Sequence, residues 1–330
     1  MRISFAGGGT DLPAYYEKHD GMVVSTAIDK YVYVFVSPNG HGSLQVSSAD
    51  YSTFIRHEGG LEVPEDGRLR YARAFLREFG IRSGHSVFIA SEMPPGSGLG
   101  SSSALSVALI KALSALQDEL PAKGQVAERA AEVEINRLQM PIGKQDHYAS
   151  AFGGINAIYF RAGGIEVEPL EISDATREWL ARSILIFFTQ QQHHSGEILA
   201  EQKQRSREQD PSAIDALHAI KGHAHEARQA LLDGQPEKLG EIMHRSWIQK
   251  KKLASGVTNK MIDAAYADAV AAGALGGKIA GAGGGGFLML VCPVQKQDEV
   301  SAVMREHGLI RSDFHPDSAG ARILVNNVAA

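Results

Sequence analysis

The sequence contains a single cysteine and no apolar run long enough to cross a membrane, and these two absences disfavour several classes of protein. Cys292 has no partner for an internal disulfide, so we expect a reducing compartment and a cytoplasmic location. A membrane-spanning helix needs about 20 consecutive apolar residues. The chain shows neither such a run nor a signal peptide, so no membrane is expected as a partner.

Positive charge is also scarce, because 33 Lys and Arg stand against 38 Asp and Glu and leave a net charge of -5. There is no basic block of the kind that nucleic-acid-binding domains use, so nucleic acid is not an expected partner. Hydrophobic residues make up 44% and charged residues 22% of the 330 residues, which is typical of a globular protein. A chain of this length most often forms two domains.

Glycine, by contrast, is abundant: its 35 residues concentrate in three loops. The second loop reads Pro-Pro-Gly-Ser-Gly-Leu-Gly-Ser-Ser-Ser over residues 94–103 and leads into an apolar-periodic stretch that predicts a helix. Glycines let backbone N–H groups approach a ligand, and a helix N-terminus adds unpaired N–H groups and the positive end of the dipole. The loop therefore predicts a nucleotide phosphate site formed by Pro95, Gly96, Ser97, Gly98, Leu99, Gly100, Ser101, Ser102 and Ser103.

Two familiar nucleotide loops do not fit this stretch. No Gly-Lys-Ser/Thr follows, which excludes a Walker A loop, and the glycines at 96, 98 and 100 do not have the GxGxxG spacing of a dinucleotide site. An ordinary Gly/Ser turn before a helix is the alternative. The combination of two prolines, three alternating glycines and three serines argues against it.

The first glycine loop opens the chain. Residues 2–6 alternate like a strand, residues 7–9 are all glycine, and Thr10 and Asp11 follow. An aspartate delivered by such a turn can accept hydrogen bonds from sugar hydroxyls, and Arg2 can pair with an anion. The alternative is a turn aspartate with a solvated arginine.

A further segment, residues 140–148, follows a predicted helix over 122–138. Pro141 and Gly143 end that helix and turn the chain, so Asp146 stands just before a new helical stretch. A carboxylate there can orient or deprotonate a hydroxyl nucleophile, and Glu134 on the preceding helix can hold Mg²⁺ through oxygen. A helix-capping aspartate and a solvent-facing glutamate are the alternatives.

The third glycine loop, around residues 281–286, predicts a hairpin between strands at 278–280 and 287–291. It formally satisfies GxGxxG, but a strand follows where a dinucleotide site needs a helix. His193 and His194 lack a third ligand at metal-site spacing, which argues against a metal there. The basic triplet at 250–252 is interpreted as a solvated face, and a last strand is expected over 322–325.

Together these segments resemble the GHMP kinases, whose ATP loop has the pattern Pro-x-Gly-x-Gly-Leu-Gly-Ser-Ser. The opening segment is similar to the first galactokinase motif. The Met-Pro-x-Gly-x-x-Asp segment has the family's glutamate at the family's spacing before it, and the glycine-rich hairpin is similar to the third motif. The resemblance implies an α+β fold of two domains, 1–175 and 176–330. The first would contain a left-handed βαβ unit, and the second would be ferredoxin-like.

The resemblance also assigns roles. It implies ATP and Mg²⁺ as cofactors, Asp146 as the catalytic base, Arg2 as the residue that assists transfer, and Ser102 with Glu134 as magnesium ligands. The substrate-binding residues that it implies are Gly8, Gly9, Thr10, Asp11, Asp146, His193, Gly283, Gly284 and Gly285.

The Gly-Gly-Gly-Thr-Asp-Leu version of the first motif is similar to the heptose-phosphate kinase branch. It implies transfer to the anomeric hydroxyl of D-glycero-D-manno-heptose 7-phosphate in a monomer or homodimer. His193 stands where that branch has an arginine, so the sequence leaves open whether the substrate already carries a phosphate. Another sugar-1-kinase, of fucose or galactose type, and a non-catalytic sugar sensor remain as alternatives.

Overall fold

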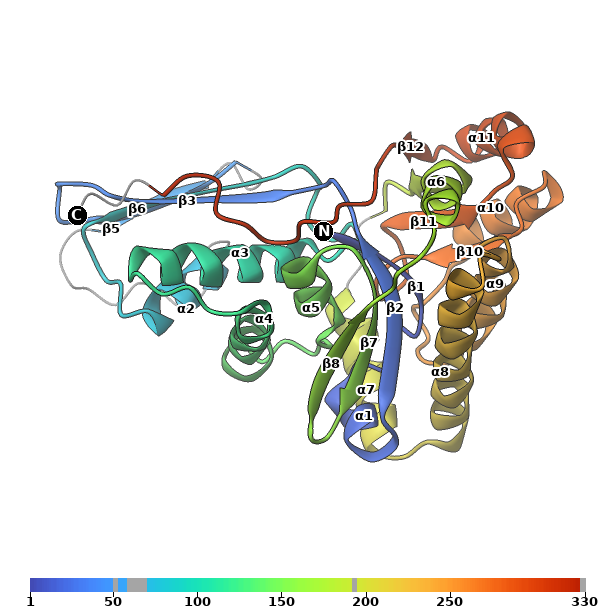
Figure 1. Cartoon of the computed structure of the whole chain (residues 1–330), viewed down its shortest axis with the longest axis horizontal. Helices are drawn as coiled ribbons and strands as arrows, with labels where there is room; N and C mark the ends of the chain where they lie inside the picture. The colour runs from blue at the N-terminus through green and yellow to red at the C-terminus, as the bar shows by residue number, and fades with distance from the viewer. Residues whose placement is uncertain (50–52, 58–69, 192–194, 327–330) are drawn as a thin grey trace.

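The computed structural model describes residues 1–49, 53–57, 70–191 and 195–326, and it contains three four-stranded sheets with helices packed against them (Figure 1). The first sheet is antiparallel and has the order β1 (Arg2–Ala6), β2 (Gly21–Ala27), β7 (Ile155–Arg161), β8 (Gly164–Pro169). The second has the order β3 (Val32–Pro38), β6 (His85–Ser91), β4 (Leu44–Ser48), β5 (Thr53–His57). In it, β4 and β6 run parallel.

Five helices belong to the part of the chain that forms these two sheets. They are α1 (Pro13–His19), α2 (Arg70–Glu78), α3 (Ser101–Leu116), α4 (Lys123–Glu132) and α5 (Gln145–Phe152). Helix α4 continues as a π-helical turn, Val133–Arg137. Helix α3 lies along β3 and packs against α2, α4 and α5 (Figure 1). Its buried face includes Leu109 and Leu113. The helix therefore lies at the centre of the hydrophobic core on the left of Figure 1.

The third sheet has the order β10 (Gly276–Ile279), β11 (Phe287–Val291), β9 (Ile184–Phe188), β12 (Ile310–Ser312). Its helices are α6 (Asp174–Ser183), α7 (Ser195–Arg207), α8 (Pro211–Leu232), α9 (Lys238–Lys250), α10 (Lys260–Ala271) and α11 (Gln297–Glu306). Alternation along β9 places Ile186 in a core with α8 and α9, and Phe187 in a second core with α10 and α11.

One core connects the first and third sheets. Ile3 and Phe5 of β1 belong to the same buried cluster as Met243 of α9, Ile186 of β9 and Met289 of β11. Burying such side chains contributes roughly 1.5–3 kcal/mol each. The first strand, with Arg2 on it, is therefore fixed against the C-terminal half of the chain.

The last described residues return to the first sheet. Asp317 donates its N–H to the Ala27 carbonyl at 2.9 Å, and its own carbonyl accepts from Gly154 at 2.7 Å. The proposed limits of 1–175 and 176–330 stay a prediction, and this tail crosses them.

The α+β fold is confirmed, as are the strands and helices expected along most of the chain, whereas the handedness of the βαβ unit stays a prediction. The last-strand prediction is wrong, because residues 322–325 form no strand and Leu324 and Val325 are exposed. The final strand is β12 instead. Among the described residues, no helix has the length and apolar character that crossing a membrane requires.

Candidate active site

The carbonyl groups of the glycine loop at 94–100 are tied to the protein. The Ser97 carbonyl accepts from the Phe287 N–H at 3.1 Å, and the Leu99 carbonyl accepts from the Arg2 N–H at 3.0 Å. The Gly98 carbonyl accepts from the Arg2 guanidinium at 2.7 Å. The loop is therefore anchored between β1 and β11 by its acceptors.

The N–H groups at the start of α3, directly after the loop, are left for a ligand. In the described part of the chain, the N–H groups of Ser101, Ser102 and Ser103 have no hydrogen-bond acceptor, as the first turn of a helix requires. The cap of α3 is Gly100, at φ 75°, and the loop is exposed at Pro95 and Gly96. Free donors and the positive end of a 16-residue helix make an anion site here.

Asp146 and Arg2 meet directly beside this loop. Arg2 lies on β1, its side chain is 4% exposed, and its Nε and Nη2 donate to the two Asp146 carboxylate oxygens at 2.6 and 2.7 Å. A Cβ placed on Gly100 would lie 3.0 Å from Asp146 Oδ2. The aspartate in the first turn of α5 therefore faces the start of α3, as the assigned catalytic roles require.

Asp11 lies behind Asp146 and is nearly inaccessible, at 2% exposure. Its carboxylate accepts from the Gly9 N–H at 2.9 Å and from the backbone N–H and side-chain amide of Gln145, each at 3.1 Å. Burial and the charge of Asp146 raise the pKa of Asp11. Asp11 thus positions Gln145 and, through it, the residue that follows.

The other predicted substrate-binding residues of the first loop differ in whether they are accessible to a substrate. The Thr10 hydroxyl is fully buried, donates to backbone carbonyls of Gly7 and Met22 and accepts from the Met22 N–H. That hydroxyl has no position left for a substrate and holds the loop to β2. Gly8 and Gly9 are partly exposed, and a Cβ added to Gly9, whose φ is 103°, would lie 2.6 Å from the Gln202 amide nitrogen.

Glu134 is fully buried and held by two donors. Its Oε2 lies 2.5 Å from His147 Nε2, and its Oε1 accepts from the Tyr71 hydroxyl. Burial alone would raise the pKa of Glu134. The charge of His147, hydrogen bonds from His147 and Tyr71, and the nearby Ser106 hydroxyl outweigh that effect and lower the pKa. Glu134 is therefore an ionised carboxylate beneath α3.

Ser106 connects this carboxylate to the loop helix. Its hydroxyl contacts Glu134 and donates at 3.2 Å to the carbonyl of Ser102, whose own side chain is exposed. An ionised carboxylate and a serine hydroxyl beside an anion site are the hard oxygen donors that Mg²⁺ prefers. These residues fit a magnesium ion, and direct coordination by Glu134 requires it to exchange one protein donor for the ion.

The third glycine loop packs against the second. A Cβ on Gly286 would lie 2.5 Å from the Ser97 carbonyl, and one on Gly98 would lie 2.5 Å from the Ala280 carbonyl. Gly283 and Gly285 are buried against Val257 and Gln191, whereas Gly284 is partly exposed and donates to the Val257 carbonyl at 2.7 Å. Replacing Gly98 or Gly286 with any larger residue would therefore push the two loops apart.

Two lysines at this junction were missed. Lys250 was assigned to a solvated triplet, but its ammonium donates to the Gly281 carbonyl and lies within the influence of Arg2, Asp11 and Asp146. Lys278 on β10 is 5% exposed, and the charges of Lys250 and Arg2 act on it. The available signals were a lysine at a helix C-terminus and a lysine in a buried strand that leads into the third glycine loop.

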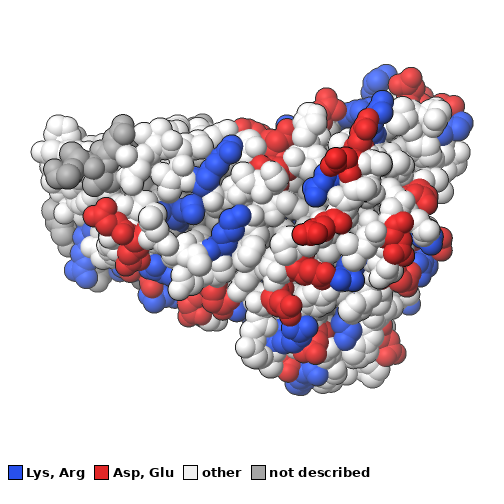
Figure 2. All heavy atoms as spheres, in the orientation of Figure 1, with Lys and Arg blue, Asp and Glu red and all other residues white. Residues whose placement is uncertain are grey.

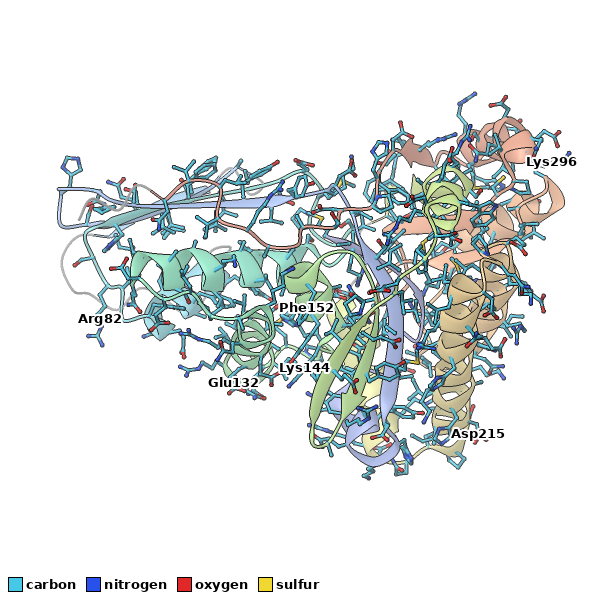
Figure 3. All side chains as sticks on the ribbon, viewed as in Figure 1. Arg82, Glu132, Lys144, Phe152, Asp215 and Lys296 are labelled. Atoms are coloured by element: carbon cyan, nitrogen blue, oxygen red, sulfur yellow. The ribbon has the colours of Figure 1, made fainter. Side chains whose placement is uncertain are left out.

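Elsewhere in the described part of the chain the ion pairs are scattered, and Arg245 contacts both Glu226 and Glu241. On the face in Figure 2, acidic and basic groups are interspersed without a large field of either sign. Figure 3 shows Lys144 between α4 and β8, where it pairs with Glu128 at 2.5 Å. His193 lies outside the described residues, so its assignment to the substrate stays a prediction.

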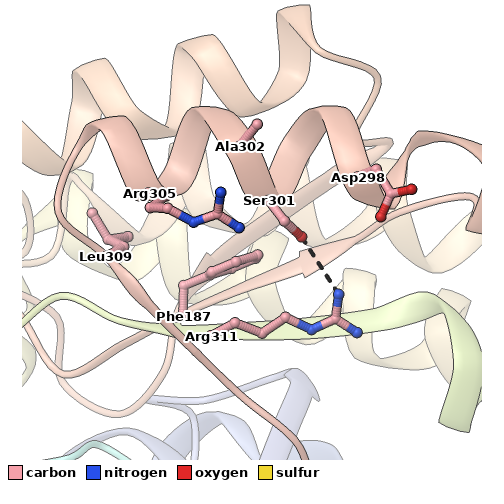
Figure 4. Close-up of a pocket in the computed structure, with 7 residues that line it drawn as sticks. All are labelled: Phe187, Asp298, Ser301, Ala302, Arg305, Leu309 and Arg311. Atoms are coloured by element: carbon pink, nitrogen blue, oxygen red, sulfur yellow. Dashed lines mark hydrogen bonds between the residues drawn. The ribbon is translucent and has the colours of Figure 1, made fainter.

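A pocket of about 390 Å³ lies between α11 and β12, apart from the glycine loops (Figure 4). Phe187 forms its base, and Arg305 and Arg311 reach into it. Arg311 contacts Ser301 at 3.4 Å and Asp313 at 3.5 Å, and Asp298 adds a carboxylate to the rim. Asp313 thus pairs with Arg311, and none of the residues that line the pocket is one that the sequence predicts for the active site.

Donors at a helix start, an Arg–Asp pair and a buried carboxylate suit transfer of a phosphoryl group, and the comparisons identify the class of protein. The model of the GHMP kinases N terminal domain matches residues 68–154, and that of the GHMP kinases C terminal matches residues 227–309.

Two curated relatives are each 30% identical. D-glycero-alpha-D-manno-heptose 7-phosphate kinase of Campylobacter jejuni aligns over 329 residues, 98% of this chain and 96% of the relative. Mevalonate kinase of Methanothermobacter thermautotrophicus aligns over 300 residues, 88% and 90%. A crystal structure of a D-glycero-D-manno-heptose 1-phosphate kinase from Bacteroides thetaiotaomicron has TM-score 0.79 and 25% identity, with 98% of both chains covered.

The chain belongs to the GHMP kinases. It is a kinase of the sugar-kinase type, and ATP is its phosphate donor.

Proposed function

We propose that the protein transfers the γ-phosphoryl group of ATP to the anomeric hydroxyl of D-glycero-D-manno-heptose 7-phosphate and yields the 1,7-bisphosphate. The observation that supports transfer most strongly is the Arg2–Asp146 pair at the start of α3, with hydrogen bonds of 2.6 and 2.7 Å. The heptose substrate is proposed from the Campylobacter jejuni relative, which is similar over 98% of this chain.

Each group at the site receives a role in this proposal. The free N–H groups of Ser101–Ser103 bind the phosphates, and the first glycine loop, with Gly8, Gly9 and Asp11, contributes to the sugar site. Asp146 accepts the proton of the attacking hydroxyl, while Arg2 holds that carboxylate in place and neutralises charge on the phosphoryl group. Positioning and electrostatic stabilisation supply most of the rate enhancement in such reactions.

Ser102 and Glu134 are proposed as the residues that hold Mg²⁺, which supplies neutralisation of the triphosphate charge when it is bound. The chain's own contribution is to keep Glu134 ionised through His147, Tyr71 and Ser106. We also propose a cytoplasmic location and a monomer or homodimer as the working assembly.

The test is an ADP-release assay with MgATP and a panel of acceptors: the 7-phosphate and 1-phosphate of the heptose, the free heptose, fucose and galactose. The 1-phosphate is included because the Bacteroides thetaiotaomicron structure carries that name. We expect the 7-phosphate to give the highest kcat/KM. A preference for fucose or galactose would replace the proposed substrate, and absence of ADP release with every acceptor would favour a sugar sensor.

A further inference from the structure

Two lysines from the C-terminal half converge on the catalytic pair without an anionic partner. Lys250 ends α9, is partly buried and donates to the Gly281 carbonyl. Lys278 in β10 is only 5% exposed. Its ammonium has no hydrogen-bond or ion-pair partner in the part of the chain that the structure describes. Buried lysines without a counterion are rare, because desolvation of the charge is unfavourable.

Strand geometry directs Lys278 toward the site. Its antiparallel partner is Met289, which belongs to the core shared with Ile3 of β1, whereas the next residue, Ile279, belongs to the core on the opposite face. Directly paired residues share a face of a sheet. The Lys278 side chain therefore lies on the face toward β1 and α9, which carry Arg2 and Lys250.

The carbonyl that Lys250 contacts belongs to the junction of the two glycine loops. A Cβ on Gly281 would lie 2.7 Å from the Cα of Gly98. Gly98 in turn accepts the guanidinium of Arg2 at 2.7 Å. The ammonium of Lys250 is thus connected to the phosphate loop through one glycine contact.

The charges around these lysines leave an excess of positive charge. Arg2 is paired with Asp146, and when both lysines are protonated three cations face two carboxylates, those of Asp146 and Asp11. Burial and Arg2 lower the pKa of Lys250 to about 8, although Asp11 and Asp146 act in the opposite direction. Burial, Lys250 and Arg2 lower the pKa of Lys278 well below its usual value.

We propose that Lys250 and Lys278 form a subsite for a phosphate dianion on the C-terminal side of the Arg2–Asp146 pair. This rests on the proposed function, because the dianion is either the terminal phosphate of the nucleotide or the phosphate that the acceptor already carries. Both ammonium groups become fully charged when the dianion binds. Binding therefore takes up protons from solution near pH 8.

The test is calorimetric titration at pH 8 in two buffers of different ionisation enthalpy, which counts protons taken up per ligand. One arm uses a magnesium complex of a non-hydrolysable ATP analogue, and the other uses the heptose 7-phosphate. We expect uptake of at least about half a proton in at least one arm, since Lys250 is about half protonated at its pKa and Lys278 adds to this uptake. The arm that shows it identifies the source of the dianion.

Substitutions test whether these two lysines, rather than other titrating groups, take up the protons. Lys250→Met and Lys278→Met should each reduce the uptake and weaken binding of that ligand at least about tenfold, because a charge-assisted hydrogen bond is lost. Lys250→Arg should keep binding but reduce the uptake, because arginine does not titrate here. Lys252→Met removes an exposed neighbouring charge and serves as the matched control.

Thermal melting of each variant checks folding, and removal of an unpaired buried charge should not lower stability. Uptake unchanged in both Met variants, or absent from both arms of the wild type, overturns the subsite. The proposed transfer reaction is judged separately by ADP release, so either conclusion can fail without the other.

Discussion

The guanidinium of Arg2 contacts both carboxylate oxygens of Asp146 across 144 positions of sequence, at 2.6 and 2.7 Å. A bidentate pair of this kind fixes the orientation of both groups. Because the same Arg2 also binds the Gly98 carbonyl, the proposed base Asp146, its partner Arg2 and the glycine loop at 94–100 form one rigid unit.

Replacement of Asp146 by Asn should reduce kcat by roughly 10²-fold or more with little change in ATP affinity, because the proton acceptor is lost while the loop N–H groups remain. Steady-state kinetics and nucleotide titration check both parts. Glu128→Gln, which removes a carboxylate paired with Lys144, should leave kcat close to wild type. Undiminished activity of Asp146→Asn would show that this carboxylate is not the base.

Gly100 and Gly96 offer a matched pair of substitutions, since both have φ 75°. Alanine at either position should lower stability by about 1–2 kcal/mol for the left-handed backbone. Only at Gly100 does the new Cβ lie 3.0 Å from Asp146; at Gly96 it meets open space.

We therefore expect Gly100→Ala to lose at least about tenfold more kcat than Gly96→Ala at equal stability, which is about 1.4 kcal/mol in the barrier. Urea unfolding and kinetics on both variants provide the comparison. Equal loss of activity would mean that the approach of Asp146 to α3 has no catalytic role.

Magnesium dependence tests the roles of Ser102 and Glu134. Ser102→Ala and Glu134→Gln should each raise the Mg²⁺ concentration needed for half-maximal activity, by about tenfold, because each removes an oxygen ligand. Activity measured against Mg²⁺ at fixed ATP gives this value, and Ser101→Ala is the control one position away. An unchanged requirement in both variants would exclude these two residues as ligands.

Stability should fall below neutral pH through His223. Burial and the charge of Arg245 lower the pKa of His223, whose Nδ1 contacts the Ser246 hydroxyl at 3.1 Å between α8 and α9. A histidine with a lowered folded-state pKa binds its proton more readily in the unfolded chain. Its unfavourable contribution is therefore absent above about pH 6.5 and grows as the pH falls.

His223→Gln should show a smaller drop in urea midpoint between pH 7.5 and 5.5 than the wild type, while exposed His41→Gln should behave as wild type. An identical drop in all three proteins would assign the pH dependence to other groups.

Much of the site was predictable because it lies on local patterns. The glycine loop, the helix that follows it and the break before Asp146 are each encoded within about a dozen residues, so spacing alone places them on the correct elements. The resemblance then joined Arg2 to Asp146, and the two hydrogen bonds between them agree with that pairing.

The hydrogen-bond partners of the buried polar groups were not predictable from the sequence. Glu134 depends on Tyr71 and His147, and Thr10 turns inward to Met22, through contacts set by packing of separate elements. Lys250 looked like part of an exposed triplet because composition does not show where a helix ends in space. Each of these contacts can be identified only once the folded structure is known.

The most direct test of the central claim is ³¹P NMR of a reaction of the wild type with MgATP and the heptose 7-phosphate. The account predicts a new anomeric phosphate signal that grows with ADP, and no such signal with Asp146→Asn over the same period. Hydrolysis of ATP to inorganic phosphate without the new signal, or an equal signal from Asp146→Asn, would contradict it.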